Sequence, residues 1–189
     1  QSGPLDMRMN QTEGETAAEW LAHASEEEII DVLKRFGEER FARRIARNIV
    51  GTRVSTPIST TDRLVEIVEM SIPRREKNKH PATRTFQAIR IQVNRELEEL
   101  ETCLHDVIEL LHSGGRMVVI SFHSLEDRIV KRFFRRMEKG DDLPARFPIR
   151  DDELNRKLRI LGKPTRASEA ETAANRRARS SIMRAAEKR

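Results

Sequence analysis

The chain of 189 residues contains a single cysteine, Cys103, and no run of apolar residues long enough to cross a membrane. One cysteine excludes an internal disulfide and a zinc site built from cysteines, and it agrees with a reducing compartment. The first residues are polar and include Pro4 and Asp6, unlike the apolar centre of a signal peptide. We therefore expect a cytoplasmic protein without structural zinc or redox chemistry.

Glycine-rich phosphate loops are also missing, because no segment matches G-x-G-x-x-G or G-x-x-x-x-G-K-[ST]. This excludes those two kinds of nucleotide grip within the chain. The chain starts at Gln1 without a methionine, which predicts that it is the later portion of a longer protein. Any cofactor grip is then expected upstream of Gln1.

Charge points to a polyanionic partner. Lys and Arg number 36 against 31 Asp and Glu, which gives a net charge of +5. The excess favours nucleic acid without establishing it, since the charged residues are largely mixed in sign along the chain. The 37% of hydrophobic residues can supply the core of one soluble domain, or of one domain with a sizeable insertion.

The most informative stretch runs from Gly114 to Arg128. Residues 117–120 form a short apolar run behind a glycine pair, which predicts a strand buried on both faces. His123 and Ser124 follow at its C-terminal end. Ser124 is expected to cap the next helix, with Asp127 completing a capping box. Open α/β sheets bind ligands beyond the carboxyl ends of their strands, so we expect chemistry near His123.

The rest of the chain reads as helices followed by two short strands. Ser25 and Glu28 predict a capping box, and Gly51 is expected to end a later helix. Expected helices cover residues 16–24, 25–37, 38–51, 61–73 and 82–111, the last with a break near Glu101. Residues 158–161 and 181–185 are expected to pair as antiparallel strands. Residues 74–80 and 140–150 read as loops, and the fold class is α/β.

Several long blocks together resemble the ribosomal RNA small subunit methyltransferase H family. The blocks follow the family's order and cover nearly the whole chain: residues 3–9 (GPLDMRM), 36–40 (FGEER), 80–88 (HPATRTFQA), 114–116 (GGR) and 120–128 (ISFHSLEDR). The resemblance implies an S-adenosylmethionine-dependent enzyme that methylates the N4 amino group of a cytidine in the decoding region of 16S rRNA. It also implies a class I, Rossmann-like methyltransferase with an inserted helical domain.

On this resemblance the chain is the C-terminal part of such an enzyme. Residues 1–15 would belong to the catalytic domain, residues 16–101 would form the inserted helical domain, and residues 102–189 would return to the catalytic domain. The family's glycine-rich S-adenosylmethionine loop and its ribose-binding acid precede the block at residues 3–9. The chain alone is therefore expected to be inactive and to hold the cofactor poorly.

Asp6 and His123 are the candidate catalytic residues. The amino nitrogen of cytosine is a poor nucleophile, and a carboxylate such as Asp6 can orient it by accepting an N–H hydrogen bond. Asp6 can equally serve a turn after Pro4 or pair with Arg8. His123 can line the same crevice, or be a loop histidine hydrogen-bonded to backbone. Ser124 fits a helix cap better than a nucleophile.

Cationic side chains are candidates for contacts to 16S rRNA or to the small ribosomal subunit. The alternative is a solvated helix face, since Glu38 and Glu39 interleave with the arginines. The four cations of residues 131–136 repeat this pattern on the helix after the strand. No metal site, no membrane contact and no particular oligomeric state are predicted. The candidates for RNA contact are Arg8, Arg40, Arg43, Arg44, Arg47, Arg84, Arg90, Ser124 and Arg128.

Composition alone, without the recognised blocks, favours a different function. A chain that is basic and mainly helical also fits a non-catalytic RNA-binding or ribosome-assembly module. The two readings differ in whether the residues around Asp6 and His123 act on the rate of a reaction or only on RNA affinity.

Overall fold

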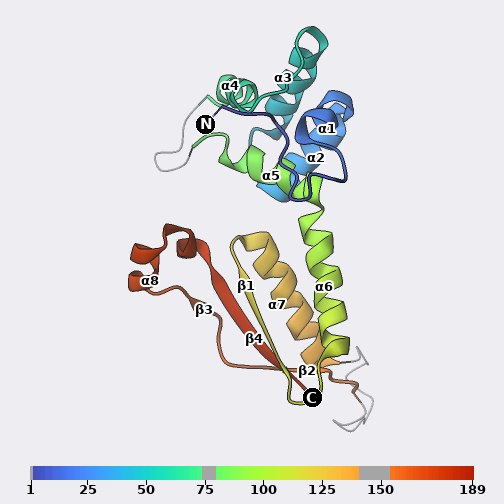
Figure 1. Cartoon of the computed structure of the whole chain (residues 1–189), viewed down its shortest axis with the longest axis vertical. Coiled ribbons are helices and arrows are strands. Elements are labelled where there is room, and N and C mark those ends of the chain that lie inside the picture. Colours follow the sequence, from blue (N-terminus) through green and yellow to red (C-terminus); the bar gives the residue numbers. More distant parts are fainter. Residues whose placement is uncertain (1, 74–79, 141–153) are drawn as a thin grey trace. The chain divides into compact units, whose positions relative to one another are not determined.

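A computed structural model describes residues 2–73, 80–140 and 154–189 of the chain (Figure 1). The chain divides into two compact units, residues 1–96 and 97–189, and each is described by itself. The predicted loops at 74–80 and 140–150 lie almost wholly outside the described residues. Among the described helices, none has the length and apolar character needed to cross a membrane.

Unit 1, residues 1–96, is helical. Capping boxes begin its first two helices, Thr16 with Glu19 and Ser25 with Glu28, and the second confirms the prediction. The buried faces meet in one core that includes Leu21, Leu33 and Ile45. The helices are α1 (Ala17–His23), α2 (Glu26–Gly37), α3 (Ala42–Ser55), α4 (Thr61–Ser71) and α5 (Thr83–Asn94).

Two predicted helix ends in this unit are wrong. Gly51 does not end a helix, because α3 continues through it to Ser55. A glycine at an exposed helical position costs only about 1 kcal/mol, and the buried Ile45 and Ile49 on the same helix outweigh that cost. The long helix breaks at Arg95, whose φ of 49° is left-handed, and not near Glu101.

Unit 2, residues 97–189, combines helices with an antiparallel sheet in the order β1-β4-β2, and β3 also pairs with β4 (Figure 1). The two segments pair antiparallel as predicted, but Leu158 faces Lys188 and Ile160 faces Ala186, so the paired partners lie beyond the expected residues 181–185. This mixture of helices and strands confirms the α/β class. The elements are α6 (Glu96–Leu110), β1 (Arg116–Ser121), α7 (Ser124–Lys139), β2 (Leu158–Ile160), β3 (Thr165–Arg166), α8 (Glu169–Ala174), η2 (Arg176–Ser180) and β4 (Ile182–Lys188).

Strand β1 is buried on one face, so the prediction that it is buried on both is wrong. Met117 is 5% exposed and packs in a core with Phe134 of α7 and Ile108 of α6. Val118 and Ile120 point to the other face and are 56% and 54% exposed. In the described part of the chain β1 pairs through one edge, with β4. The apolar run therefore includes a second face, formed by Val118 and Ile120, that no described residue covers.

Two helical glycines test the packing of unit 1. A Cβ at Gly37 would lie 2.8 Å from the carbonyl oxygen of Arg84, where α2 approaches α5, whereas a Cβ at Gly51 would meet nothing. We expect Gly37→Ala to lower the free energy of unfolding by about 1–3 kcal/mol through overpacking. Gly51→Ala, the matched control, should raise it by about 0.5–1 kcal/mol. Urea unfolding followed by circular dichroism measures both, and equal effects would contradict the close approach.

Candidate functional site

The segment of residues 3–9 is held in place by the backbone at the ends of neighbouring helices. Ala17 and Ala18, the first residues of α1, donate their N–H groups to the carbonyl oxygens of Asp6 and Leu5, at 2.7 Å and 2.9 Å. Leu5 in turn donates to the carbonyl oxygen of Ser59 at 2.9 Å, just ahead of α4. The first amides of a helix have no intrahelical acceptor, so this segment satisfies them.

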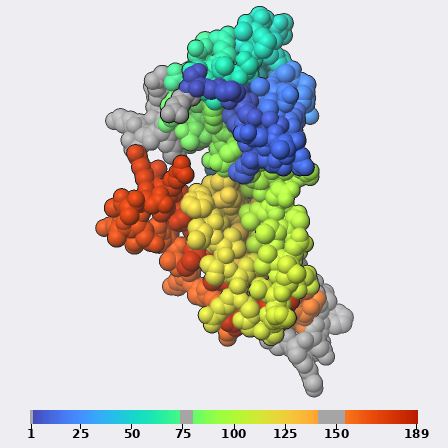
Figure 2. All heavy atoms as spheres, viewed as in Figure 1, coloured from blue at the N-terminus to red at the C-terminus, as the bar shows by residue number. Residues whose placement is uncertain are grey.

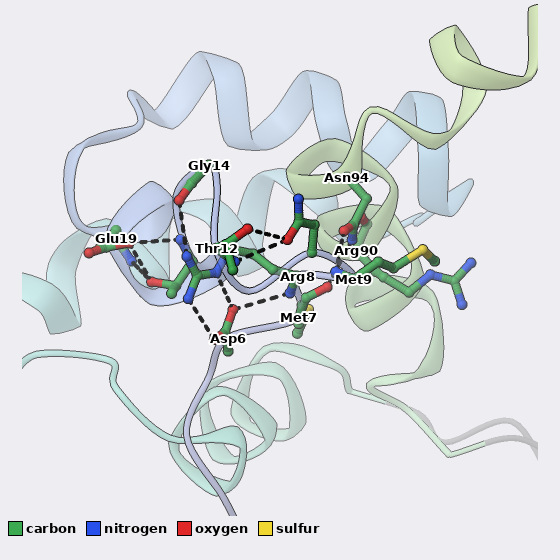
Figure 3. A network of polar contacts seen from close by, with 11 residues as sticks. Asp6, Met7, Arg8, Met9, Thr12, Gly14, Glu19, Arg90 and Asn94 are labelled. Carbon is green, nitrogen blue, oxygen red and sulfur yellow. Dashed lines mark hydrogen bonds and ion pairs between the residues drawn. The ribbon is translucent and has the colours of Figure 1, made fainter.

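Asn94, the last residue of α5, clamps the same segment from the other side (Figure 3). Its Nδ2 donates to the carbonyl oxygen of Met7 at 2.8 Å, and its Oδ1 accepts from the N–H of Met9 at 2.7 Å. Met7 between these contacts has a φ of 65°, a left-handed conformation that is costly for a residue with a Cβ. The clamp therefore holds a strained backbone. Sequence analysis missed Asn94, because nothing local marks this asparagine.

Asp6 is engaged by Arg8 through a bidentate ion pair (Figure 3). Its Oδ1 accepts from Arg8 Nε at 2.7 Å, and its Oδ2 accepts from Nη2 at 3.0 Å. The guanidinium also donates to the carbonyl oxygen of Gly14 at 3.2 Å. These hydrogen bonds from Arg8 lower the pKa of Asp6, which keeps it ionised. The alternative that Asp6 pairs with Arg8 is confirmed, and its role as acceptor for an amino group stays a prediction.

His123 lies at the end of β1 in unit 2 and is the N-cap residue of helix α7. Its Nδ1 accepts from the N–H of Glu126 at 3.4 Å, and its Nε2 lies 3.3 Å from Oε1 of the same residue. Glu126 Oε2 accepts from the N–H groups of Phe122 at 2.7 Å and His123 at 3.2 Å. The expected cap at Ser124 with Asp127 is thus wrong by one residue. Ser124 is the first residue of the helix. His123 is the N-cap in its place, because its ring accepts from the Glu126 N–H in the way that a serine hydroxyl accepts in a capping box.

Asp127 instead ties the start of α7 to the middle of β4. Its two carboxylate oxygens accept from Arg184 Nε at 2.7 Å and Nη2 at 3.0 Å. Both side chains are largely buried. The hydrogen bonds from Arg184 lower the pKa of Asp127. This pair fixes the helix whose first turn carries His123.

The arginines proposed for RNA contact fall into two groups. Arg8 and Arg90 are bound to carboxylates, Arg90 to Glu96 through two hydrogen bonds of 2.7 Å and 2.9 Å. Arg84 is half-buried and hydrogen-bonded or paired within the protein. The exposed group consists of Arg40, Arg43, Arg44, Arg47 and Arg128, together with Ser124. Exposure keeps these side chains accessible to a ligand, and their role in RNA binding stays a prediction.

Replacing Asn94 tests the clamp on Met7 and Met9. We expect Asn94→Ala to lower the free energy of unfolding by about 1–2 kcal/mol, because the part-buried carbonyl of Met7 and the exposed amide of Met9 lose their partner. Hydrogen exchange of the Met9 amide should accelerate. Asn94→Asp keeps the acceptor for Met9 but loses the donor to Met7, so the Met9 amide should stay more protected than in Asn94→Ala.

A matched control for this test lies in the same loop. Among the described residues Asn10 hydrogen-bonds only to exposed loop neighbours, such as the N–H of Thr12 at 3.1 Å. Asn10→Ala should change the unfolding free energy by no more than about 0.5 kcal/mol. If Asn10→Ala lowered the free energy of unfolding as much as Asn94→Ala, the proposed anchoring of the loop by Asn94 would be contradicted.

The pair of Asp127 and Arg184 makes stability depend on pH. Because the folded pKa of Asp127 is lowered, its contribution is complete above the ordinary value of about 3.9 and is lost as pH falls through the folded pKa. The gap in unfolding free energy between the wild type and Asp127→Asn should therefore be constant near neutral pH and close in acid. Asp31→Asn, which breaks an exposed pair with Arg35, should cost at most about 0.5 kcal/mol. A gap that does not vary with pH would contradict the ion pair.

The whole chain, residues 1–189, matches the MraW methylase family. It is 59% identical over 187 residues to the ribosomal RNA small subunit methyltransferase H of Chromohalobacter salexigens, which covers 98% of the chain and 56% of that relative. The proteins of the same name from Thioalkalivibrio sulfidiphilus and Pseudoalteromonas atlantica are 55% and 52% identical, over 98% of the chain and 60% of each relative. The chain thus spans somewhat more than half the length of these relatives, and it belongs to the MraW methylase family.

Proposed function

We propose that this chain supplies the C-terminal part of an enzyme that methylates the N4 amino group of a cytidine in the decoding region of 16S rRNA, with S-adenosylmethionine as donor. The names of the matched relatives support methylation of small-subunit rRNA. The choice of cytidine N4, of the decoding region and of the donor is our proposal. The substrate is 16S rRNA or the small ribosomal subunit, in the cytoplasm.

The observation that carries this proposal is the open side of β1. Val118, Ile120 and Met183 leave an apolar sheet face exposed, with Phe122 beyond it at 54% exposure. An apolar face and an unpaired strand edge of this kind favour a further packed neighbour. The relatives extend beyond the matched part, which supports a larger, Rossmann-like sheet that continues from β1. His123 would then lie at the carboxyl end of a sheet strand, where α/β folds bind ligands.

S-adenosylmethionine does not fit the described residues of this chain. The sequence has no glycine-rich loop, and Glu126, the carboxylate at the end of β1, is occupied by the backbone amides of Phe122 and His123. We therefore place the donor site in the part of the relatives that this chain does not span. The roles proposed for Asp6 and His123 concern the RNA substrate and not the methyl donor.

Asp6 is the proposed acceptor for the cytidine amino group. Its pairing with Arg8 keeps it ionised, and a carboxylate oxygen retains a free lone pair after it accepts one hydrogen bond. A fixed anion beside the amino group orients the nitrogen and stabilises the positive charge that develops on it. His123 is proposed to line the same crevice and to contact the base or a phosphate.

For the complete protein we propose the catalytic domain at residues 1–15 and 102–189 and an inserted helical domain at residues 16–101. The change from an all-helical unit to a sheet-bearing unit at residues 96 and 97 supports a boundary near 101. The close attachment of residues 3–9 to α1, α4 and α5 supports a rigid connection between segment and insertion.

Methyl transfer by the complete natural polypeptide that carries this chain tests the function. We expect label from S-adenosylmethionine to enter one cytidine of small-subunit rRNA, identified as N4-methylcytidine by mass spectrometry of the nucleosides. Asp6→Asn and His123→Ala should lower kcat at least tenfold while changing RNA affinity little. His112→Ala and Asp62→Asn, which replace an exposed histidine and an exposed aspartate, serve as matched controls.

The outcome also separates the enzyme from the alternative. Variants that lose RNA affinity and turnover in equal proportion would contradict the catalytic roles of Asp6 and His123. Binding of rRNA without methyl transfer, by a complete polypeptide that is folded, would instead support a non-catalytic RNA-binding or assembly module.

A further inference from the structure

The excess positive charge of the chain is concentrated near its C-terminus. Residues 157–189 contain ten Lys and Arg and three Glu, a net charge of +7, whereas the whole chain carries +5. Residues 1–96 are nearly balanced, with sixteen Lys and Arg and fifteen Asp and Glu. Within this segment α8 and η2, orange-red in Figure 2, contain no buried residue. Unit 2 as a whole, residues 97–189, has twenty Lys and Arg and sixteen Asp and Glu, a net charge of +4, so a polyanion is attracted to it more than to unit 1.

A shallow hollow lies in unit 2 between α7 and the turn that joins β2 to β3. About 300 Å³ of space open to solvent is bounded by these elements and by β4. Its cationic residues are Lys131 and Arg135 of α7, Lys163 of the turn and Arg184 of β4. Phe134, Ile160 and Pro164 supply an apolar floor, which weakens the screening of the charges by water.

The four cations differ in whether they have a hydrogen-bond or ion-pair partner within the protein. Arg184 is held by Asp127 through two hydrogen bonds, so that carboxylate is neutralised by a cation of the hollow itself. Lys131, Arg135 and Lys163 have no hydrogen-bond or ion-pair partner among the described residues. The turn leaves room for a ligand, because Gly162, with a φ of 67°, has open space where a Cβ would lie. Arg135 and Lys163 are exposed and Lys131 is half-buried, and all three lie around Arg184, which its ion pair holds in place.

The chemistry of the lining selects phosphate over bases. The polar side chains among its described residues are all cationic, and ammonium and guanidinium groups donate hydrogen bonds but accept none. The edges of bases carry donors as well as acceptors, whereas a phosphodiester offers acceptors and negative charge alone. A shallow hollow also suits a backbone that passes over it better than a base that must be enclosed.

We propose that this hollow, formed by Lys131, Arg135, Lys163 and Arg184, binds the phosphodiester backbone of the RNA substrate. The identity of the RNA rests on the proposed function. The proposal places the electrostatic contact with the RNA backbone in unit 2. It positions the substrate and takes no part in the transfer of the methyl group. Binding there is independent of sequence and depends strongly on salt.

Salt-dependent RNA binding by the chain tests the proposal. The probes are a labelled single-stranded RNA of small-subunit rRNA sequence and a labelled oligouridine of equal length, titrated at several salt concentrations. The triple variant Lys131→Gln, Arg135→Gln, Lys163→Gln should bind both probes at least tenfold more weakly. The slope of log affinity against log salt should fall by about 2, since each lost phosphate contact on a single strand contributes about 0.7.

A control variant removes the same charge elsewhere. Lys34→Gln, Arg35→Gln, Arg63→Gln takes three cations from α2 and α4 of unit 1 and should leave the slope unchanged. Thermal unfolding by circular dichroism must show both triple variants folded. Equal loss in the two variants, or loss confined to a variant of Arg40, Arg43, Arg44 and Arg47 on α3, would overturn the proposal.

The same variants separate this proposal from the proposed function. If the complete polypeptide methylates rRNA but the triple variant at the hollow keeps the wild-type salt slope, the proposed phosphate site is wrong and the proposed function stands. If the hollow governs the salt slope but no methyl group is transferred, the phosphate site stands and the function is wrong.

Discussion

Hydrogen bonding between the segment of residues 3–9 and the ends of three helices is the constraint on which unit 1 depends. The first amides of α1 need acceptors that the helix cannot supply, and Leu5 and Asp6 provide their carbonyl oxygens. Asn94 completes the anchoring at the end of α5 and holds Met7 in a left-handed conformation. The ion pair of Asp6 and Arg8 forms on this fixed backbone. The candidate carboxylate is therefore positioned by main-chain contacts far apart in sequence.

In unit 2 the corresponding role falls to β4, which pairs with all three other strands of the sheet. Arg184 on this strand binds Asp127 and so fixes the first turn of α7, where His123 caps the helix. The same arginine lines the hollow together with Lys131, Arg135 and Lys163. One residue therefore links the proposed substrate-facing histidine to the proposed phosphate contact. The exposed apolar face of β1 lies outside this arrangement and marks where the unit is open to further structure.

Local signals predicted the elements whose ends are governed by neighbouring residues. Ser25 and Glu28 cap α2 as expected, because both residues of a capping box lie within one turn. The break of the long helix was placed near Glu101 but occurs at Arg95, and Gly51 was expected to end a helix that continues. For Gly51 the cause is that packing of a helix face outweighs the propensity of one residue. The cap at His123 was missed because histidine rarely supplies the acceptor that serine or aspartate usually provides.

The sequence by itself determined the helical and strand segments, the antiparallel pair near the C-terminus, the α/β class and the family, since periodicity, caps and contiguous blocks are properties of neighbouring residues. Tertiary structure alone decided that Asn94 clamps Met7 and Met9, and that Asp127 binds Arg184 and not the helix start. It also decided that β1 has one open face and that cations of α7 and the β2–β3 turn meet in one hollow. Contacts between residues tens of positions apart depend on how the chain closes on itself, which no local pattern encodes.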